Sequence, residues 1–331
     1  MKAVVLGATG FLGLNLVEAL KAAGHDVVAT RRPSSNTIYL RRFKVPLKSV
    51  RLEDPESLVA AMDGAEVAFF SAGHYPRLSI DTEKQVEQGV RGLKNALEAA
   101  RQAGVRRFVY TGSVATVAHP KDGRPAVEAD GLIAKAPQGS TYYAVKLAMD
   151  HAIDEAVAAG QDVVTLMPTG CFGPYDHKVG TGFFIVALAN RALATYVEGR
   201  TNIVDARDVA LGHLAAATKG RAGERYILGG TNLGITDLLQ KMAEQYDVPP
   251  PGCCMPAAEA LAYATAEEAR CHGTPNRPAM SREMVDMALE GQFVDVAKAR
   301  TELDFNPRPL EETLTGAFEW YRQNGYIRIA A

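Results

Sequence analysis

The chain has 331 residues, of which 47% are hydrophobic and 22% charged, a globular composition that excludes disordered and collagen-like proteins. Its 36 basic and 38 acidic side chains leave a net charge of −2, so the charge does not indicate nucleic acid or an anionic membrane as a partner. Because no apolar run is long enough for a signal peptide or a membrane span, we expect a soluble, cytoplasmic protein.

Up to Met167, short apolar strands alternate with amphipathic helices. Runs rich in β-branched residues predict buried parallel strands at 3–6, 26–30, 48–52, 66–71, 107–111 and 162–167. Apolar residues at helical spacing predict helices from about Leu12 to Gly24, from Asp54 onward, and over 82–103 and 140–159. This alternation predicts an α/β fold with a doubly wound parallel (Rossmann) sheet and helices on both faces.

The pattern changes after Pro168. Loops lengthen, and helices are predicted near 256–270, 280–290 and 309–324. Segments 202–205 and 225–228 are expected to return the chain to the sheet at least once. We therefore expect a larger domain formed by 1–170 and about 201–230, and a smaller, mostly helical lobe formed by 171–200 and 231–331.

A glycine loop lies between the first predicted strand and the first predicted helix. Gly7 lets the chain turn sharply, Gly10 removes a Cβ where backbone would touch a phosphate, and Gly13 lets the helix lie close to the sheet. The helix N-terminus then offers free N–H groups to an anion. No Gly-Lys-Ser/Thr follows, which excludes an ATP-binding P-loop. The loop predicts a dinucleotide-binding domain for 1–170 and about 201–230, which leaves the smaller lobe to bind the substrate.

The end of the second strand indicates which dinucleotide is bound. Sites that prefer NAD usually place an acidic residue there, to hold the ribose hydroxyls. This chain has Arg31, Arg32 and Ser35 in that segment instead. Guanidinium and hydroxyl groups suit a 2′-phosphate, so the sequence favours NADP, with NAD as the alternative.

Ser113, Tyr142 and Lys146 form the predicted catalytic group. Ser113 follows the fifth strand, and Tyr142 and Lys146 fall one turn apart on one face of the next helix. We expect the lysine ammonium and an oxidised nicotinamide ring to lower the pKa of the tyrosine from about 10. Tyr142 could then act as general acid toward a ketone, and Ser113 could donate to the same oxygen. Tyr143 is three residues from Lys146 and fits better as a neighbour.

These residues resemble the extended short-chain dehydrogenase/reductase family, in the branch of dihydroflavonol reductases within the NAD-dependent epimerase/dehydratase superfamily. The resemblance covers most of the chain. Further matching segments are Phe70-Ser-Ala-Gly73, Pro168 with Phe172-Gly-Pro174, and the stretches 202–210, 224–230 and 302–310.

The resemblance implies that Ser113, Tyr142 and Lys146 are catalytic. It also implies a set of cofactor contacts: Gly7, Thr9, Gly10, Phe11, Leu12, Gly13, Leu52, Ser71, Ala72, Gly73, Lys146 and Pro168. One departure is Arg51, which stands where many members carry an aspartate for the adenine amino group. Adenine would then be held by neighbours such as Leu52.

Three functions remain open. The first is an NADPH-dependent carbonyl reductase for a mainly apolar or aromatic ketone or aldehyde, with His74, Tyr75 and Phe172 as substrate contacts. The second is a nucleotide-sugar epimerase with tightly bound NAD, for which Arg191, Arg200 and Arg277 could hold the diphosphate. The third, a non-catalytic dinucleotide sensor, would not need the serine, tyrosine and lysine together.

The sequence predicts no metal site. Cys253 and Cys254 are adjacent, which does not match the spacing of zinc ligands, so we interpret them, with Cys271, as free thiols. As in the family, the helices at 82–104 and 140–159 could form a homodimer.

Overall fold

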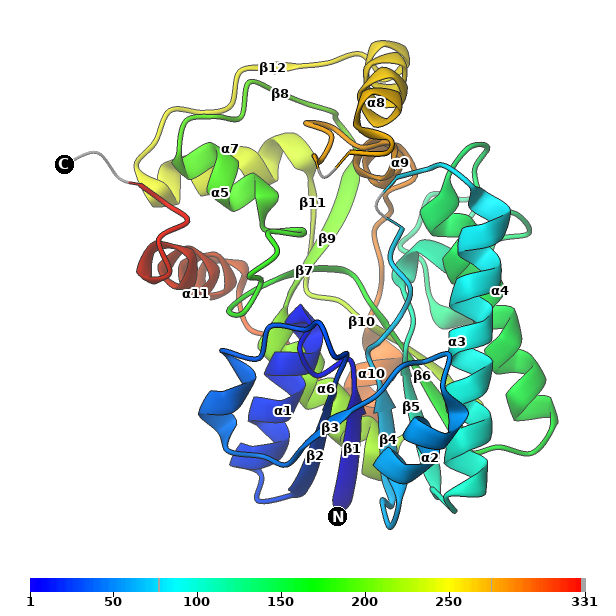
Figure 1. Ribbon diagram of the computed structural model, residues 1–331. Helices are drawn as coiled ribbons and strands as arrows, with labels where there is room; N and C mark the ends of the chain where they lie inside the picture. The colour runs from blue at the N-terminus through cyan, green and yellow to red at the C-terminus, as the bar shows by residue number, and fades with distance from the viewer. Residues whose placement is uncertain (77, 275, 329–331) are drawn as a thin grey trace.

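The computed structural model describes residues 1–76, 78–274 and 276–328. Its largest sheet has seven strands in the order β10-β6-β5-β4-β1-β2-β3, and each neighbouring pair is parallel. Figure 1 shows this sheet between two layers of helices. The strands are β1 (Lys2–Leu6), β2 (Asp26–Arg31), β3 (Leu47–Ser49), β4 (Val67–Phe70), β5 (Arg107–Thr111), β6 (Val163–Pro168) and β10 (Arg225–Leu228). The predicted α/β, doubly wound fold is confirmed.

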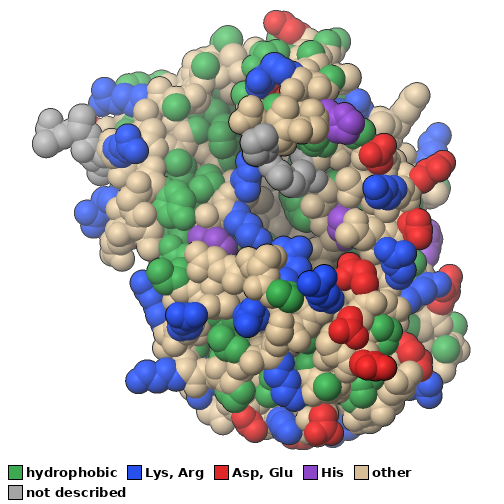
Figure 2. Space-filling model, viewed as in Figure 1, with side chains coloured by type: hydrophobic (Ala, Val, Ile, Leu, Met, Phe, Trp, Pro, Cys, Tyr) green, Lys and Arg blue, Asp and Glu red, His purple; other side chains and the backbone are tan. Residues whose placement is uncertain are grey.

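A second, mostly helical lobe lies beyond the carboxyl ends of the strands of the main sheet (Figure 1). Its helices are α5 (Phe183–Ala189), α7 (Ile235–Tyr246), α8 (Ala257–Cys271), α9 (Arg282–Leu289) and α11 (Leu310–Gln323). Two small sheets accompany them, β11-β9-β7 (Thr231–Gly234, Arg200–Asp205, Gly170–Phe172) and β12-β8 (Cys253–Cys254, Thr195–Tyr196). Figure 2 shows a hollow between the lobes, around which Lys and Arg side chains gather.

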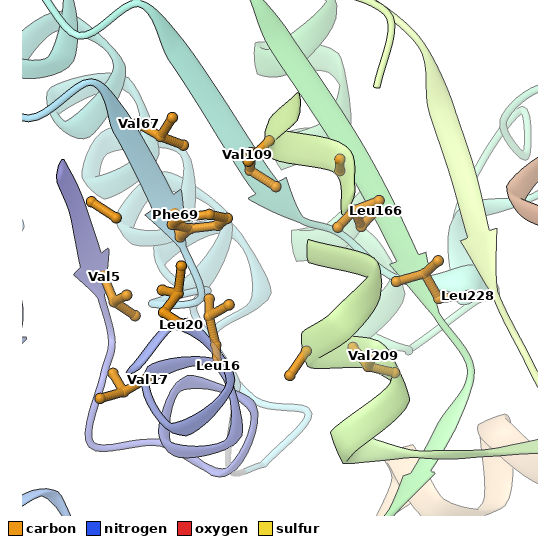
Figure 3. Close-up of a cluster of buried hydrophobic side chains, with 14 of the residues drawn as sticks. Val5, Leu16, Val17, Leu20, Val67, Phe69, Val109, Leu166, Val209 and Leu228 are labelled. Carbon is orange, nitrogen blue, oxygen red and sulfur yellow. The ribbon is translucent and has the colours of Figure 1, made fainter. Parts of the chain in front are cut away.

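The inner strands of the main sheet are buried on both faces because they are largely apolar, whereas β3 at one edge is mostly exposed. On β1, Ala3 and Val5 pack against one layer, whereas Val4 and Leu6 pack against the other. The first layer consists of α1 (Phe11–Ala22), α6 (Ala206–Lys219) and α10 (Ala297–Leu303), and part of its core is drawn in Figure 3. The second layer consists of α2 (Pro55–Met62), α3 (Thr82–Gln102) and α4 (Thr141–Ala158). Short 3₁₀ turns lie at η1 (Leu40–Phe43), η2 (Val114–Thr116) and η3 (Glu128–Asp130).

Most predicted elements agree with the structure, and the differences have local causes. The third strand ends at Ser49 rather than at residue 52. The chain turns there, with the Asp54 N–H donating to the Arg51 carbonyl, and leads directly into α2. Of the two predicted returns to the sheet, β10 joins it, but β9 pairs with β7 and β11 instead. Helices α5, α6, α7 and α10 were not predicted from the sequence.

Among the described residues, none of the helices combines the length and the apolar character that crossing a membrane requires.

Candidate active site

The glycine loop lies where the direction of strand addition reverses in the sheet. From β1 the chain adds β2 and β3 on one side, and β4, β5, β6 and β10 on the other. Gly7 has φ +82°, and a Cβ built on it would lie 2.6 Å from the carbonyl oxygen of Ser71, at the end of β4. A Cβ on Gly13 would lie 2.3 Å from Gly7 O. The loop, the first turn of α1 and the end of β4 are therefore packed backbone to backbone.

Gly10 differs from these two glycines. A Cβ built on it would meet only Gly7 O, at 3.3 Å, so its open side faces no other protein atom of the described residues. Gly10 is also the N-cap of α1, and no side chain caps the helix. Thr9, Phe11 and Leu12 lie beside it at this uncapped end. Free N–H groups beside a glycine without a Cβ suit a pyrophosphate, so the residues fit a dinucleotide.

The predicted adenosine end lies beside β2. The Arg31 guanidinium donates to the carbonyl of Pro33 at 3.2 Å, Arg32 is exposed, and Ser35 N closes the turn by donating to Arg32 O. Leu52 lies on the neighbouring turn, where Asn95 holds its carbonyl at 2.8 Å. Two further cations approach from the second lobe.

These cations are Lys178 and Arg277. The Arg277 guanidinium donates to Lys178 O at 2.8 Å. Partial burial, and then the charges of Arg32 and Arg277, lower the pKa of Lys178. Lys178 therefore lies in a positively charged cluster with Arg32 and Arg277.

The structure brings Ser113, Tyr142 and Lys146 together. Ser113 Oγ lies 3.0 Å from the hydroxyl of Tyr142, and Lys146 Nζ lies 5.9 Å from the centre of the Tyr142 ring. The three residues are 7%, 6% and 7% exposed. A Cβ on Gly73, after β4, would lie 3.0 Å from Lys146 Nζ, so the lysine reaches the end of β4. This arrangement can hold a carbonyl oxygen with two hydroxyl donors and supply a proton to it.

The pKa of Tyr142 is raised, not lowered as the sequence analysis expected. Burial is the main cause, Glu283 adds to it, and the hydrogen bond from Ser113 opposes it. Burial also lowers the pKa of Lys146, and the negative charges of Asp150 and Glu283 oppose this effect. The protein alone therefore holds Tyr142 as a neutral phenol. The expected lowering of this pKa depended in part on the positive charge of an oxidised nicotinamide ring.

Of the predicted substrate contacts, Tyr75 lies nearest to the catalytic group. Its ring centre is 5.1 Å from that of Tyr142, its side chain is 55% exposed, and its hydroxyl donates to the Glu283 carboxylate on α9. His74 points toward α3, where its Nε2 contacts the side-chain oxygen of Gln85. Phe172 lies in the core of the second lobe and is only 2% exposed, so its ring packs there instead of lining an open wall.

The remaining predicted contacts lie around the edge of the sheet. Ser71 Oγ lies 2.9 Å from Thr111 Oγ1, which also contacts buried His213 at 2.8 Å. Ala72 follows Ser71, and Pro168 is buried at the end of β6. Cys253 and Cys254 are exposed, and no three His, Cys, Asp or Glu side chains of the described chain lie close enough together to hold a metal ion.

Two carboxylates near the site were not predicted. Glu283 has no sequence signal, because it is far along the chain from the residues it approaches. Asp150 could have been found, since it follows Lys146 by one helical turn. Burial raises the pKa of Glu283 to about 7 and that of Asp150 to about 6.

Comparisons with known proteins agree with this geometry. Residues 3–229 match the model of the NAD dependent epimerase/dehydratase family. The chain is 32% identical to a putative dihydroflavonol 4-reductase of Synechocystis sp. over 98% of this chain and 95% of the relative. It is 30% identical to cinnamoyl-CoA reductase 2 of Arabidopsis thaliana, covering 74% and 78% of the two chains. A solved structure from Pseudomonas aeruginosa, described as a nucleoside-diphosphate-sugar epimerase, matches at 34% identity with a TM-score of 0.82 over 99% of both chains.

Proposed function

Since the chain belongs to the NAD-dependent epimerase/dehydratase family, and is an NAD(P)-dependent oxidoreductase of the extended short-chain dehydrogenase/reductase type, we propose that it is an NADPH-dependent carbonyl reductase. The substrate would be a mainly apolar or aromatic ketone or aldehyde. The observation that carries the proposal is the 3.0 Å contact between Ser113 and Tyr142, with Lys146 beside the same ring. The names of the plant and cyanobacterial reductases support a carbonyl substrate.

Each residue has a separate part in the proposed reaction. When bound, the dinucleotide supplies the hydride. Ser113 and Tyr142 hold the carbonyl oxygen, and Tyr142 gives it a proton as negative charge develops there. Lys146 places a positive charge beside the ring and stabilises the phenolate that remains. Gly7, Gly10 and Gly13 admit the pyrophosphate to the N-terminus of α1.

A panel assay tests this function. The purified protein is incubated with NADPH and, separately, with an aryl ketone, a dihydroflavonol, a 3-ketosteroid and a UDP-sugar, and loss of NADPH absorbance is followed. We expect oxidation with at least one of the three carbonyl classes and none with the UDP-sugar. If no carbonyl compound is reduced while the UDP-sugar is isomerised, the reductase proposal is wrong.

Arg31→Ala should weaken NADP binding about 10- to 100-fold, since a hydrogen bond to a charged group is worth about 1.5–3 kcal/mol. NAD has no 2′-phosphate, so its affinity should change by less than about threefold. Isothermal titration calorimetry with both dinucleotides measures the two values. Arg106→Ala, an exposed arginine just before β5, is the matched control and should change neither. Equal losses for NADP and NAD would contradict a 2′-phosphate contact.

Glu283→Gln should relax a preference for uncharged substrates. The carboxylate beside Tyr75 and Tyr142 is ionised above its pKa of about 7 and would then repel an anionic substrate. At pH 8, we expect kcat/KM for benzoylformate to rise about tenfold and that for acetophenone to stay within about threefold, because one screened charge at this range is worth about 1.4 kcal/mol. Glu259→Gln, on the exposed face of α8, should alter neither value. If the ratio of kcat/KM for benzoylformate to that for acetophenone does not change, Glu283 does not act on the charge of the substrate.

A nucleotide-sugar epimerase with tightly bound NAD is the second candidate. The name of the Pseudomonas structure and the cluster of the cations Arg32, Lys178 and Arg277 favour it. Of the other predicted diphosphate ligands, Arg200 lies over the ring of Phe293, 5.3 Å from its centre. Heat denaturation of freshly purified protein distinguishes the two functions: an epimerase releases about one NAD per chain, whereas a reductase exchanges its dinucleotide during purification.

Several further expectations stay proposals. They are the domain limits, the cytoplasmic location and a homodimer through α3 and α4. The exposed side chains of α3 are charged or Gln, so such a dimer would have a polar interface. Sedimentation at low and high salt would test it.

A further inference from the structure

Asp150 is a buried carboxylate with no part in the proposed reaction. It is 1% exposed, and neither of its oxygens has a hydrogen-bond partner within the described structure. Burying an unpaired carboxylate costs several kcal/mol, so it is found where a nearby charge compensates for it. The charges around Asp150 therefore decide what it does.

Asp150 belongs to a polar stripe on α4. Tyr142, Lys146, Asp150 and Asp154 follow one another at intervals of four residues, so neighbouring members lie about 5–6 Å apart at Cβ on one face of the helix. Tyr142 and Lys146 form the catalytic end of the stripe, and Asp154 is exposed at the other end. Asp150 is therefore the next charged group after the catalytic lysine.

The sheet beneath α4 completes the surroundings of Asp150. Tyr110 on β5 and Arg225 on β10 both lie level with Thr165 of β6, so they flank the same point of the sheet. A Cβ on Gly112 would lie 3.4 Å from Asp150 Oδ1 and 3.3 Å from Cε1 of the Tyr110 ring. The Tyr110 hydroxyl and Arg225 Nε are also buried without a hydrogen-bond partner within the described structure. The carboxylate thus faces a phenol and a guanidinium.

The charged and titratable groups facing Asp150 come from three elements. They are Tyr142, Lys146 and Asp154 on α4, Tyr110 on β5 and Arg225 on β10. Arg225 is held in turn by Asp154, at 2.5 Å. The carboxylates that act on Lys146 are those of Asp150 and Glu283.

We propose that Asp150 is the positioning residue that keeps Lys146 charged, so that an ammonium remains beside Tyr142 at alkaline pH. Burial removes Lys146 from water and favours its neutral amine; a carboxylate one helical turn away opposes this loss of charge. Arg225 is a second cation that favours the ionised form of the same carboxylate. The inference concerns the charge of Lys146 and deepens the proposed function, which uses that charge.

Competitive labelling of Lys146 tests the inference without substrate or turnover. The cofactor-free protein is treated with a trace of acetic anhydride between pH 7 and 11, and mass spectrometry follows acetylation of the Lys146 peptide. Only the neutral amine reacts, so the midpoint reports the titration of Lys146. In Asp150→Asn, we expect the midpoint to fall by about one pH unit or more. Glu155→Gln, which changes an exposed carboxylate of α4 that pairs with Lys94 on α3, is the control and should leave it unchanged.

The pH profile of turnover provides a second measurement. With NADP and an aryl alcohol such as 1-phenylethanol, the alkaline limb of kcat/KM should move to lower pH in Asp150→Asn by the same amount. A uniform loss of rate with no shift of the limb, or a labelling midpoint equal to that of the wild type, would overturn the inference. If the protein turns over no alcohol, the proposed function fails, whereas the labelling result still decides the role of Asp150.

Arg225→Gln keeps the test valid if Asp150→Asn does not fold. Asp150 remains ionised at the pH where lysine titrates, and it loses the cation that competes for its charge. The Lys146 midpoint should therefore rise slightly instead of falling. A fall in Arg225→Gln would contradict the proposed arrangement.

Discussion

Tyr142→Phe is expected to lower kcat for carbonyl reduction by about 10² to 10⁴, the usual contribution of a positioned general acid. The phenylalanine ring fills the same buried site, so packing against Tyr75 and Tyr143 should persist. Only the proton donor and the 3.0 Å contact with Ser113 are lost. Stopped-flow measurement of NADPH oxidation gives the rate, and calorimetry should show NADP affinity within about threefold of the wild type.

Tyr143→Phe is the matched control for this experiment. Tyr143 adjoins Tyr142 on α4 and is also buried, but its hydroxyl makes no contact with Ser113. We expect its kcat to stay within about threefold of the wild type. Undiminished NADPH oxidation in Tyr142→Phe, with every substrate accepted by the wild type, would favour the non-catalytic sensor and reject the enzyme mechanism.

Gly10→Ala and Gly13→Ala are expected to fail in different ways. In Gly13→Ala the new methyl group would lie 2.3 Å from Gly7 O and 2.9 Å from Ala8 Cα. Both are backbone atoms, which cannot move aside as the end of a flexible side chain would. Although alanine favours a helix by about 1 kcal/mol over glycine, we expect a net loss of about 2 kcal/mol in the free energy of unfolding from the steric conflict. Urea denaturation of the cofactor-free protein measures it.

Gly10→Ala should instead leave the free energy of unfolding within about 0.5 kcal/mol of the wild type, because its Cβ meets only Gly7 O at 3.3 Å. The methyl group would occupy the space where a pyrophosphate approaches the N-terminus of α1. We expect NADP and NAD affinity to fall together, by about 10- to 100-fold. A destabilised Gly10→Ala with normal dinucleotide affinity would show that the loop serves packing and does not hold the phosphates.

The catalytic group shows how far local sequence spacing can predict a site. Tyr142 and Lys146 share a helix face because of helical periodicity, and Ser113 follows a strand whose carboxyl end lies at the binding edge of a parallel sheet. Both relations are properties of single elements and of strand order. The structure brings the three side chains together accordingly, although their roles stay a prediction until the variants are measured.

Other features depended on contacts between distant elements. Glu283 meets Tyr75 only because α9 lies over the loop after β4, and nothing near either residue in the chain indicates this contact. Strand β9 was expected at the main sheet, but it pairs with β7 and β11, which are themselves short strands with weak sequence patterns. Phe172 is an apolar residue in a loop-rich segment, where a pocket wall and a packed core have the same composition.

The sequence alone determines the doubly wound sheet, the glycine loop after the first strand and the helix that carries Tyr142 and Lys146. These features follow from hydrophobic periodicity and backbone sterics, which act within a few residues. Tertiary structure alone decided that burial raises the pKa of Tyr142, that Asp150 faces Arg225, and that a carboxylate of the second lobe contacts Tyr75 beside Tyr142. These features depend on how far each group is removed from water and on the distances between charged groups. Both are set by packing between elements that are far apart in the chain.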